Sequence, residues 1–441
     1  MSAFWCELAW TGERAEADVL VELEGERIAR VATGVAVPPP EATRLGGLAI
    51  PGFANAHSHA FQRALRGRVE NGGGSFWTWR ERMYQLADAL DPDSCRELAT
   101  AAFAEMALAG ITTVGEFHYL HHDRDGARYS DPNAMGKALI AAAREAGVRL
   151  TLLDACYLHG GIGTEPKGVQ RRFADADAEG WAGRVSELSE SPDVRIGAAI
   201  HSVRAVDPES AATVAAWARE RDRSLHAHLS EQPAENEACI EAYGSTPAAV
   251  FADAGALGEH FAAVHATHLA EGDFELLGGA RATCCLCPTT ERDLADGIGP
   301  ARRLADSGAR LALGTDSNAV IDMFEEARAV ELDERLASGA RGHHTAGELL
   351  RAATVRGHAC LGWPEGGRIG PGALCDLVTV DLDGVRLAGT DRDDPIPSLV
   401  FAGSAADVRD VIVGGRQIVR DRRHTSVDAA GMLRNRIDGL L

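Results

Sequence analysis

The stretch Ala49-Ile50-Pro51-Gly52-Phe53-Ala54-Asn55-Ala56-His57-Ser58-His59 is the most informative segment of this chain for both fold and chemistry. A mostly apolar run leads into two histidines separated by one residue. Because side chains alternate along a strand, His57 and His59 point to the same side. Two neutral imidazoles that converge in this way suit a zinc ion, although two solvated histidines at a strand end would show the same pattern.

Length and charge narrow the class of protein. The 441 residues fit a (β/α)₈ barrel plus an accessory domain. The formal net charge of −21, without a basic block, argues against nucleic acid and an anionic membrane as partners. The first residues lack a basic start followed by an apolar run, and no apolar segment approaches the ~20 residues of a membrane span. We therefore expect a soluble, cytoplasmic protein.

The cysteines predict no disulfide framework. Nine cysteines in a chain of this length are too sparse and irregular for a disulfide-rich secreted protein, so reduced thiols are expected. Cys284, Cys285 and Cys287 could form half of a zinc site, but no second cysteine pair exists. Their apolar surroundings favour packing in a buried strand.

The middle of the chain alternates short apolar runs with amphipathic stretches, the pattern of repeated β/α units. Helices are expected at 92–108, which Asp91 precedes, and at 207–221. The number of units favours a closed TIM-like barrel over 49–367. Its predicted strands are 48–56, 112–117, 149–155, 194–200, 224–229, 261–265, 282–287 and 309–313.

Both chain ends contain strand-like pieces, which predict one small β-sandwich domain from 1–48 and 368–441. Alternating residues at 18–23, 27–31 and 376–381 carry the pattern. A hairpin is expected at 408–419, around the turn Gly414-Gly415.

Polar residues follow the predicted barrel strands. The carboxyl ends of the strands form the rim at which active sites of this fold are found. Histidines confined to the core would have no reason to prefer one end of every strand. The residues at these positions are His57, His59, Glu116, His118, Tyr157, His159, His201, His228, His265 and Asp316.

Further metal-ligand candidates lie in Leu225-His226-Ala227-His228-Leu229-Ser230-Glu231 and beside Gly314. His226 and His228 share one strand face, so alternation alone cannot choose between them. Asp316 would add a carboxylate. Three imidazoles and one carboxylate suit zinc, with iron or manganese possible.

The order His57-x-His59, His228, His265 and Asp316 resembles the amidohydrolase superfamily. The resemblance implies a metal-bearing (β/α)₈ barrel flanked by a β-sandwich from both termini, and a homodimer. It selects His57, His59, His228 and Asp316 as ligands. Binuclear relatives bridge their metals with a lysine after strand four; here the two lysines, Lys137 and Lys167, lie elsewhere, so one Zn²⁺ is expected, with Fe or Mn possible.

Glu231, three residues after His228, resembles the deaminase branch of that superfamily. The resemblance implies that Glu231 moves protons, that His265 orients the nucleophile or stabilises the tetrahedral intermediate, and that Asp316 accepts a proton from water. A salt bridge on the rim is the alternative interpretation of Glu231.

Several further stretches, among them Trp77-Thr78-Trp79-Arg80 and His201-Ser202-Val203-Arg204, resemble family members that act on a linear amidine with two carboxylates. The alternatives are a ring amidine such as guanine as substrate, or a barrel without catalytic activity. Arg80 could instead contact Trp77 and Trp79 by cation–π interaction. The resemblance assigns substrate contacts to Gln62, Arg80, Tyr119, His201 and Arg204.

Overall fold

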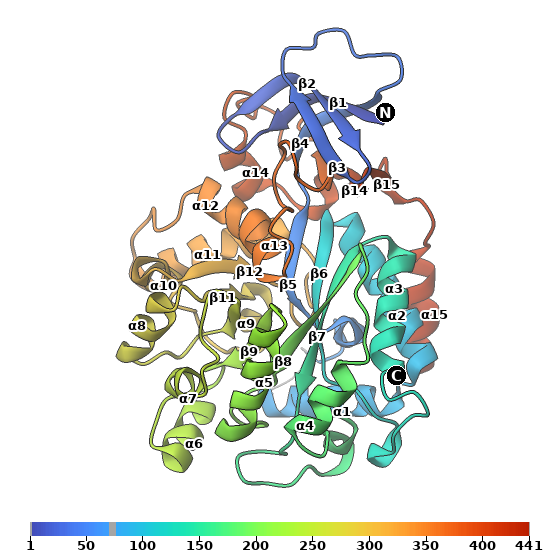
Figure 1. Ribbon diagram of the computed structural model, residues 1–441. Helices are drawn as coiled ribbons and strands as arrows, with labels where there is room; N and C mark the ends of the chain where they lie inside the picture. Colours follow the sequence, from blue (N-terminus) through green and yellow to red (C-terminus); the bar gives the residue numbers. More distant parts are fainter. Residues whose placement is uncertain (1, 70–75, 441) are drawn as a thin grey trace.

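The computed structural model describes residues 2–69 and 76–440. Within these ranges, eight parallel strands alternate with helices and form the barrel in the lower part of Figure 1. Each strand pairs with the next, and a bridge between Ser58 and Asp316 joins the first strand to the segment after the last. The strands are β5 (Phe53–Ser58), β6 (Ile111–His118), β7 (Arg149–Cys156), β8 (Val194–Ile200), β9 (Leu225–Leu229), β10 (Phe261–His265), β11 (Thr283–Leu286) and β12 (Arg310–Leu313).

Helices surround the barrel, as the alternating pattern predicts. Aspartates at the starts of two helices cap them. Asp91 caps α2 by accepting from Ser94 N at 2.8 Å, and Asp207 caps α5 by accepting from Ser210 N at 3.0 Å. The α-helices are α1 (Phe76–Ala89), α2 (Pro92–Leu108), α3 (Ala134–Ala146), α4 (Ala178–Val185), α5 (Pro208–Glu220), α6 (Pro233–Tyr243), α7 (Pro247–Asp253), α8 (Glu271–Gly279), α9 (Pro288–Asp293), α10 (Ala301–Ser307), α11 (Met323–Ser338), α12 (Ala346–Arg351), α13 (Gly357–Cys360), α14 (Ile396–Ala402) and α15 (Ala429–Leu440).

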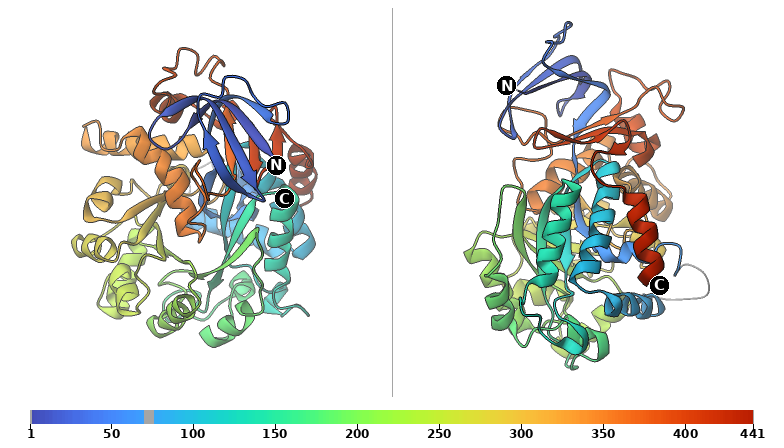
Figure 2. Two further views of the ribbon diagram at one scale, coloured as in Figure 1. Left: turned by 45° about the horizontal axis from the view of Figure 1, so that its top comes forward. Right: turned by 90° about the vertical axis from the view of Figure 1, so that its right-hand side faces the viewer.

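Short helical turns complete the secondary structure. They are η1 (Ala60–Leu65), η2 (Arg124–Gly126), η3 (Gly168–Arg172), η5 (Ala405–Asp407) and the π-helical turn η4 (Ala352–Arg356). The C-terminal helix α15 packs along α2 on the outside of the barrel, as Figure 2 shows.

A second sheet is built from both chain ends and lies over the amino-terminal end of the barrel (Figures 1 and 2). Within the described residues it has eight strands, in the order β16-β15-β14-β13-β4-β1-β2-β3. The α/β architecture predicted from the sequence, a barrel with a β domain from both termini, is confirmed. The strands are β1 (Ala3–Trp10), β2 (Ala15–Glu24), β3 (Arg27–Ala32), β4 (Thr43–Pro51), β13 (Leu377–Val380), β14 (Val408–Val413), β15 (Arg416–Arg420) and β16 (Arg423–His424).

The first predicted barrel strand, 48–56, is divided in the structure. Its first half belongs to β4, where Ile50 pairs with Val378 of the terminal sheet, and the barrel strand begins at Phe53. Gly52 lies between β4 and β5, where the chain passes from the terminal sheet into the barrel. A Cβ at this position would come within 2.3 Å of Thr112 Oγ1. The sequence did not predict this division, because a continuous apolar run without a turn signal gives no sign that its two halves belong to different sheets.

A buried ion pair joins the barrel to the terminal sheet. Arg149 opens β7, and its Nε lies 2.9 Å from Asp376 Oδ2, while its Nη2 lies 3.0 Å from Glu26 Oε2. The Arg149 side chain is only 2% exposed. Because removing one partner of a buried pair leaves an uncompensated charge, this contact fixes the two parts together.

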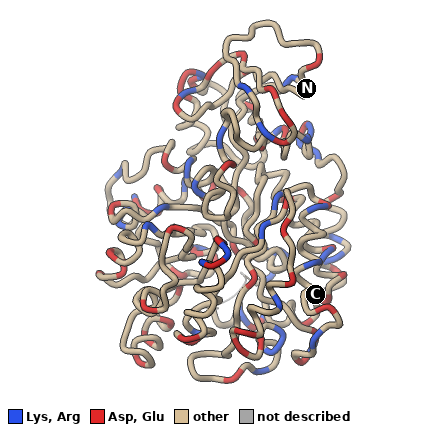
Figure 3. The backbone as a smooth tube through the Cα atoms, in the orientation of Figure 1, with Lys and Arg blue, Asp and Glu red and all other residues tan. Residues whose placement is uncertain are grey.

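The remaining expectations concern thiols, charge and membranes. Each of the nine cysteines is a buried free thiol, as predicted. Acidic and basic residues are interspersed over the molecule (Figure 3). Of the helices in the described ranges, none has the length and apolar character needed to cross a bilayer.

Candidate metal centre and substrate pocket

Three histidine nitrogens and one carboxylate converge at the carboxyl end of the barrel. His228 Nε2 lies 3.2 Å from His57 Nε2. Asp316 Oδ1 lies 3.3 Å from His57 Nε2 and 3.4 Å from His59 Nε2. Ligand atoms of the three histidines all lie within 4.8 Å of one another, and all four side chains are buried. The geometry therefore brings together the four residues that the sequence proposes as metal ligands.

Hydrogen bonds orient two of these imidazoles for coordination. His59 Nδ1 lies 2.9 Å from Phe117 O and His228 Nδ1 lies 2.8 Å from His201 O. Because a carbonyl only accepts, each Nδ1 carries the proton and each Nε2 keeps its lone pair for a cation.

The pKa values agree with this arrangement. Burial lowers the pKa of His57 to about 3 and also lowers the pKa values of His59 and His228, so the rings are neutral at pH 7. Burial would raise the pKa of Asp316, but the neighbouring His57, His265 and His59 outweigh it and hold that pKa well below its usual range. Neutral imidazoles and an ionised carboxylate fit a divalent metal ion.

The structure distinguishes between His226 and His228. His226 Nε2 lies 3.2 Å from Cys360 O, at the end of α13, whereas His228 faces His57. His226 is therefore a buried structural residue, although it lies only two positions in sequence before the proposed ligand His228.

Glu231 and His265 lie beside the proposed ligands. His265 Nε2 is 3.8 Å from both Glu231 Oε1 and Asp316 Oδ2, and its Nδ1 is 3.3 Å from Glu291 Oε1. Burial raises the pKa of Glu231, although the nearby charges of His265 and Arg204 oppose this shift. Burial would lower the pKa of His265, but the facing carboxylates raise it well above the usual value. Glu231 and His265 face each other and can exchange a proton.

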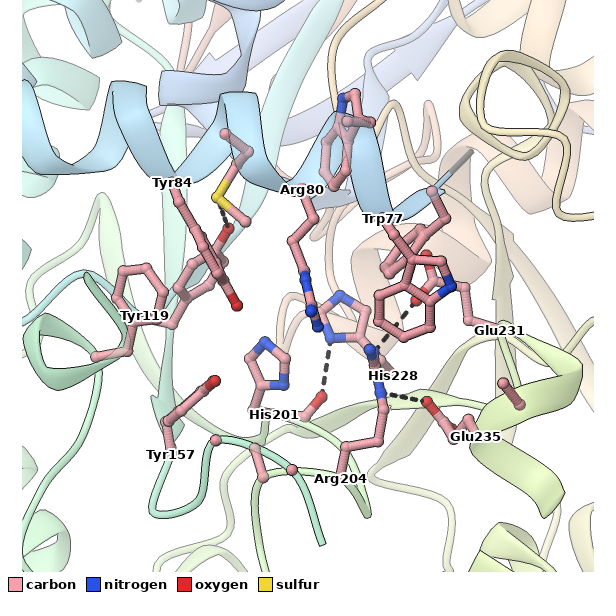
Figure 4. Close-up of a pocket in the computed structure, with 18 of the residues that line it drawn as sticks. Trp77, Arg80, Tyr84, Tyr119, Tyr157, His201, Arg204, His228, Glu231 and Glu235 are labelled. Carbon is pink, nitrogen blue, oxygen red and sulfur yellow. Dashed lines mark hydrogen bonds and ion pairs between the residues drawn. The ribbon is translucent and has the colours of Figure 1, made fainter. Parts of the chain in front are cut away.

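A cavity of about 310 Å³ opens beside these groups, under α1 (Figure 4). All of the predicted site residues except the buried His57 line this cavity. Arg80 approaches from α1, with Cζ 4.4 Å from the Trp77 ring centroid, so it makes the cation–π contact and also faces the cavity. Gln62 Nε2 donates to Tyr119 OH at 3.0 Å. The lining residues from the prediction are His59, Gln62, Arg80, Tyr119, His201, Arg204, His228, Glu231, His265 and Asp316.

Two rim residues turn away from the cavity. Glu116 accepts from Ala60 N at 2.7 Å, and burial raises its pKa to about 8. His118 lies 3.3 Å from His121, outside the barrel interior. Because residues alternate along β6, it is Phe117, between them, that contacts His57, with ring centroids 5.1 Å apart.

Two further groups of residues could in principle hold a metal ion. His118, His121 and Asp154 lie together, but Arg184 donates to both oxygens of Asp154 at 2.9 Å, which satisfies that carboxylate. Cys287 lies near His265 and Asp316, within 4.8 Å between ligand atoms. The thiol thus packs in the core, as predicted, and also borders the site.

Three residues that contribute to the site were not predicted. Glu291, on α9, orients His265, and Glu235, on α6, pairs with Arg204. Arg172 donates to Leu90 O at 2.7 Å and to Ala87 O, so it holds the end of α1, the helix that carries Arg80. For Glu291 and Glu235 the signal in the sequence is an acidic residue in the first turn of the helix that follows a barrel strand, which is common at helix starts.

Comparisons with known proteins agree with this architecture. The model of the amidohydrolase family matches residues 48–418. A formimidoylglutamate deiminase from Pseudomonas aeruginosa is 38% identical over 397 residues, 87% of each chain. A 5-methylthioadenosine/S-adenosylhomocysteine deaminase from Halobacterium salinarum is 30% identical, covering 95% of this chain and 92% of that protein. The crystal structure of an amidohydrolase from Brucella melitensis superimposes with a TM-score of 0.92 at 32% identity, covering 100% of both chains.

Proposed function

Since the chain belongs to the amidohydrolase family and is a hydrolase acting on a carbon–nitrogen bond, we propose that its reaction is the deimination of N-formimino-L-glutamate. Water is added, the bond to the terminal nitrogen breaks, and N-formyl-L-glutamate and ammonia are released. With this reaction we propose a place in histidine degradation in the cytoplasm. The observation that carries the substrate assignment is the presence of two arginines, Arg80 and Arg204, in the cavity beside the imidazole cluster.

The chemistry of the substrate explains why two arginines matter. N-formimino-L-glutamate carries two carboxylates and one cationic amidine. A guanidinium can bind a carboxylate through two parallel hydrogen bonds, and the chain as a whole repels anions because of its net charge of −21. Local arginines must therefore supply the attraction. The ionised Asp316 offers negative charge beside the cavity, where the amidine would lie.

We propose that His57, His59, His228 and Asp316 hold one divalent metal ion, with zinc as the ion that this donor set suits best. When bound, such an ion lowers the pKa of a water molecule from 15.7 to about 7 and so supplies a nucleophile at neutral pH. Two observations support this assignment. His59 and His228 carry their protons on Nδ1, so the lone pair of each Nε2 is free for a cation, and Asp316 is ionised.

The proposed proton transfers use groups that already face one another. Asp316 accepts the proton of the attacking water. His265, fixed at Nδ1 by Glu291, orients the nucleophile through Nε2. Glu231, whose raised pKa lets it hold a proton, delivers that proton to the departing nitrogen.

Ammonia release from N-formimino-L-glutamate by the zinc-loaded protein tests this proposal, with guanine, S-adenosylhomocysteine and N-formyl-L-glutamate as parallel substrates. Ammonia from N-formimino-L-glutamate alone is the expected result. Ammonia from guanine or S-adenosylhomocysteine instead would retain the metal site and overturn the role of the arginines. If none of these compounds releases ammonia although one zinc ion is bound, the result would favour a barrel without catalytic activity.

A further inference from the structure

Glu235 is a fully buried carboxylate in the first turn of α6, at the wall of the substrate cavity. Figure 4 shows it facing Arg204 Nε, with Glu231 facing Nη2 at the far end of the guanidinium. Glu235 Oε2 lies 2.8 Å from Arg204 Nε. Because a buried carboxylate is costly unless it is paired, Glu235 and Arg204 depend on each other for charge compensation.

The other oxygen of Glu235 ties the carboxylate to the backbone. Ser230 N donates to Glu235 Oε1 at 2.9 Å. Ser230 has φ of 51°, in the left-handed region, and directly precedes Glu231. One oxygen of Glu235 thus accepts a hydrogen bond from the turn that presents Glu231, and the other lies at ion-pair distance from Arg204. The carboxylate cannot rotate away without losing one of these contacts.

This pairing determines which edge of Arg204 is available. A guanidinium binds a carboxylate either through Nε and one Nη or through its two Nη atoms. Glu235 lies beside Nε as an ion-pair partner, and Nη2 donates to Glu231 Oε2 at 3.4 Å. The Arg204 side chain, 18% exposed, keeps its Nη end toward the cavity.

We propose that Glu235 is a positioning residue that holds the Arg204 guanidinium so that its Nη end receives one carboxylate of the substrate. The proposal rests on the proposed function, since it assumes an anionic substrate. Glu235 itself acts through Arg204, and it also keeps Arg204 from pairing with Glu231 alone. Its loss should weaken binding of dicarboxylates and leave the chemical step largely intact.

Glu235→Gln is the direct test, because glutamine keeps an oxygen for Ser230 N and removes the charge beside Arg204. Glu237→Gln, at an exposed position of the same helix, is the matched control. We expect the Kd of N-formyl-L-glutamate, measured by calorimetry, to rise about 10- to 100-fold in E235Q, the range for one charge-assisted hydrogen bond. KM should rise similarly, with kcat changed by less than about threefold. The E237Q control should match the wild type.

A double-mutant cycle with Arg204→Lys separates positioning from a general structural effect. Lysine keeps the charge that Glu235 needs but has no planar fork to orient. We expect the effect of E235Q on Kd to shrink at least about threefold in the R204K background. Glu235→Asp keeps the negative charge on a side chain that is one methylene shorter. It provides a second variant in case E235Q folds poorly, and it should give an intermediate Kd.

The outcomes that contradict the proposal are distinct. Equal Kd values in wild type, E235D and E235Q, or an undiminished effect of E235Q in the R204K background, would overturn the role of Glu235 while ammonia release by the wild type upholds the proposed function. A wild-type protein that releases no ammonia from N-formimino-L-glutamate would overturn both.

Discussion

His57 Nε2 and His228 Nε2 lie 3.2 Å apart, although 171 positions separate the two residues in the chain. The first residue belongs to β5 and the second to β9, so only the closed barrel brings them together. Without a cation, His57 Nε2 can donate a hydrogen bond to His228 Nε2, whereas a cation bound between the two rings would be held by both lone pairs. The proposed metal binding would therefore depend on closure of the barrel.

The two histidines of β9 provide a matched test of the metal centre. We expect His228→Asn to lose the metal, because it removes a lone pair from the cluster. His226→Asn should keep about one equivalent of zinc, since His226 bonds only to Cys360 O. Zinc content by atomic spectroscopy after dialysis measures both variants.

The thermal midpoint distinguishes the two variants further. A ligand that binds only the folded state raises the midpoint, so chelation should lower it in the wild type and in H226N, and zinc should restore it. Equal zinc content in H228N and the wild type would contradict the ligand assignment.

Much of the barrel could be predicted from the sequence, because its strands are buried on both faces and appear as continuous apolar runs. The run at 194–200 coincides with β8 and that at 261–265 with β10. His57, His59 and Asp316 were found because they follow such runs. The choice of His228 over His226 required the resemblance, since both share one face and only the contact with Cys360 separates them.

Other features could not be predicted, for physical reasons. Glu235 and Arg204 are distant in sequence, and nothing in an acidic residue at a helix start reveals which charge it meets in space. Glu116 and His118 lie at the end of β6, as cavity-lining residues lie at the ends of other strands, but the side on which each strand residue points depends on where the strand enters the barrel.

Replacing Glu231 by Gln should reduce kcat at least about 100-fold, the scale for a positioned proton transfer. The amide cannot deliver the proton that the carboxyl group, with its raised pKa, can hold. Zinc content should stay at the wild-type value, and Glu237→Gln serves as the control for a glutamate exchange nearby. Steady-state ammonia release is the measurement. Near-normal turnover in E231Q would remove Glu231 from the proton transfer.

Arg204→Met should reduce kcat/KM for N-formimino-L-glutamate by about 100-fold, because a charge-assisted contact to one carboxylate is lost. The thermal midpoint should also fall, since Glu235 remains buried without its partner. Arg128→Met, at an exposed position, controls for the loss of one positive charge. An unchanged kcat/KM would show that Arg204 does not contact the substrate.

The free energy of unfolding should depend on pH because of the buried ion pair between Asp175 and Arg184. Burial would raise the pKa of Asp175, but His122 and Arg184, with Arg184 Nη2 at 2.7 Å, hold it well below its usual range. The stabilisation is therefore present above the unfolded-state pKa of about 4 and is lost as the pH falls through the lower folded-state pKa. Between pH 7 and pH 3, the difference in unfolding free energy between wild type and Asp175→Asn should shrink by about 1 kcal/mol.

Urea unfolding at several pH values measures this difference, and Asp391→Asn, an exposed exchange, controls for the change in net charge. A difference that stays constant from pH 7 to pH 3 would show that Asp175 does not contribute through its ionisation.

The order of strands in the terminal sheet has a consequence for biosynthesis. β4 pairs with β1 on one side and with β13 on the other, and β13 follows the whole barrel in the sequence. As the chain leaves the ribosome, the second edge of β4 has no partner until the barrel has been synthesised. An open strand edge is a template for association with other chains. The nascent protein must therefore shield this edge until β13, which emerges only after the whole barrel, closes it.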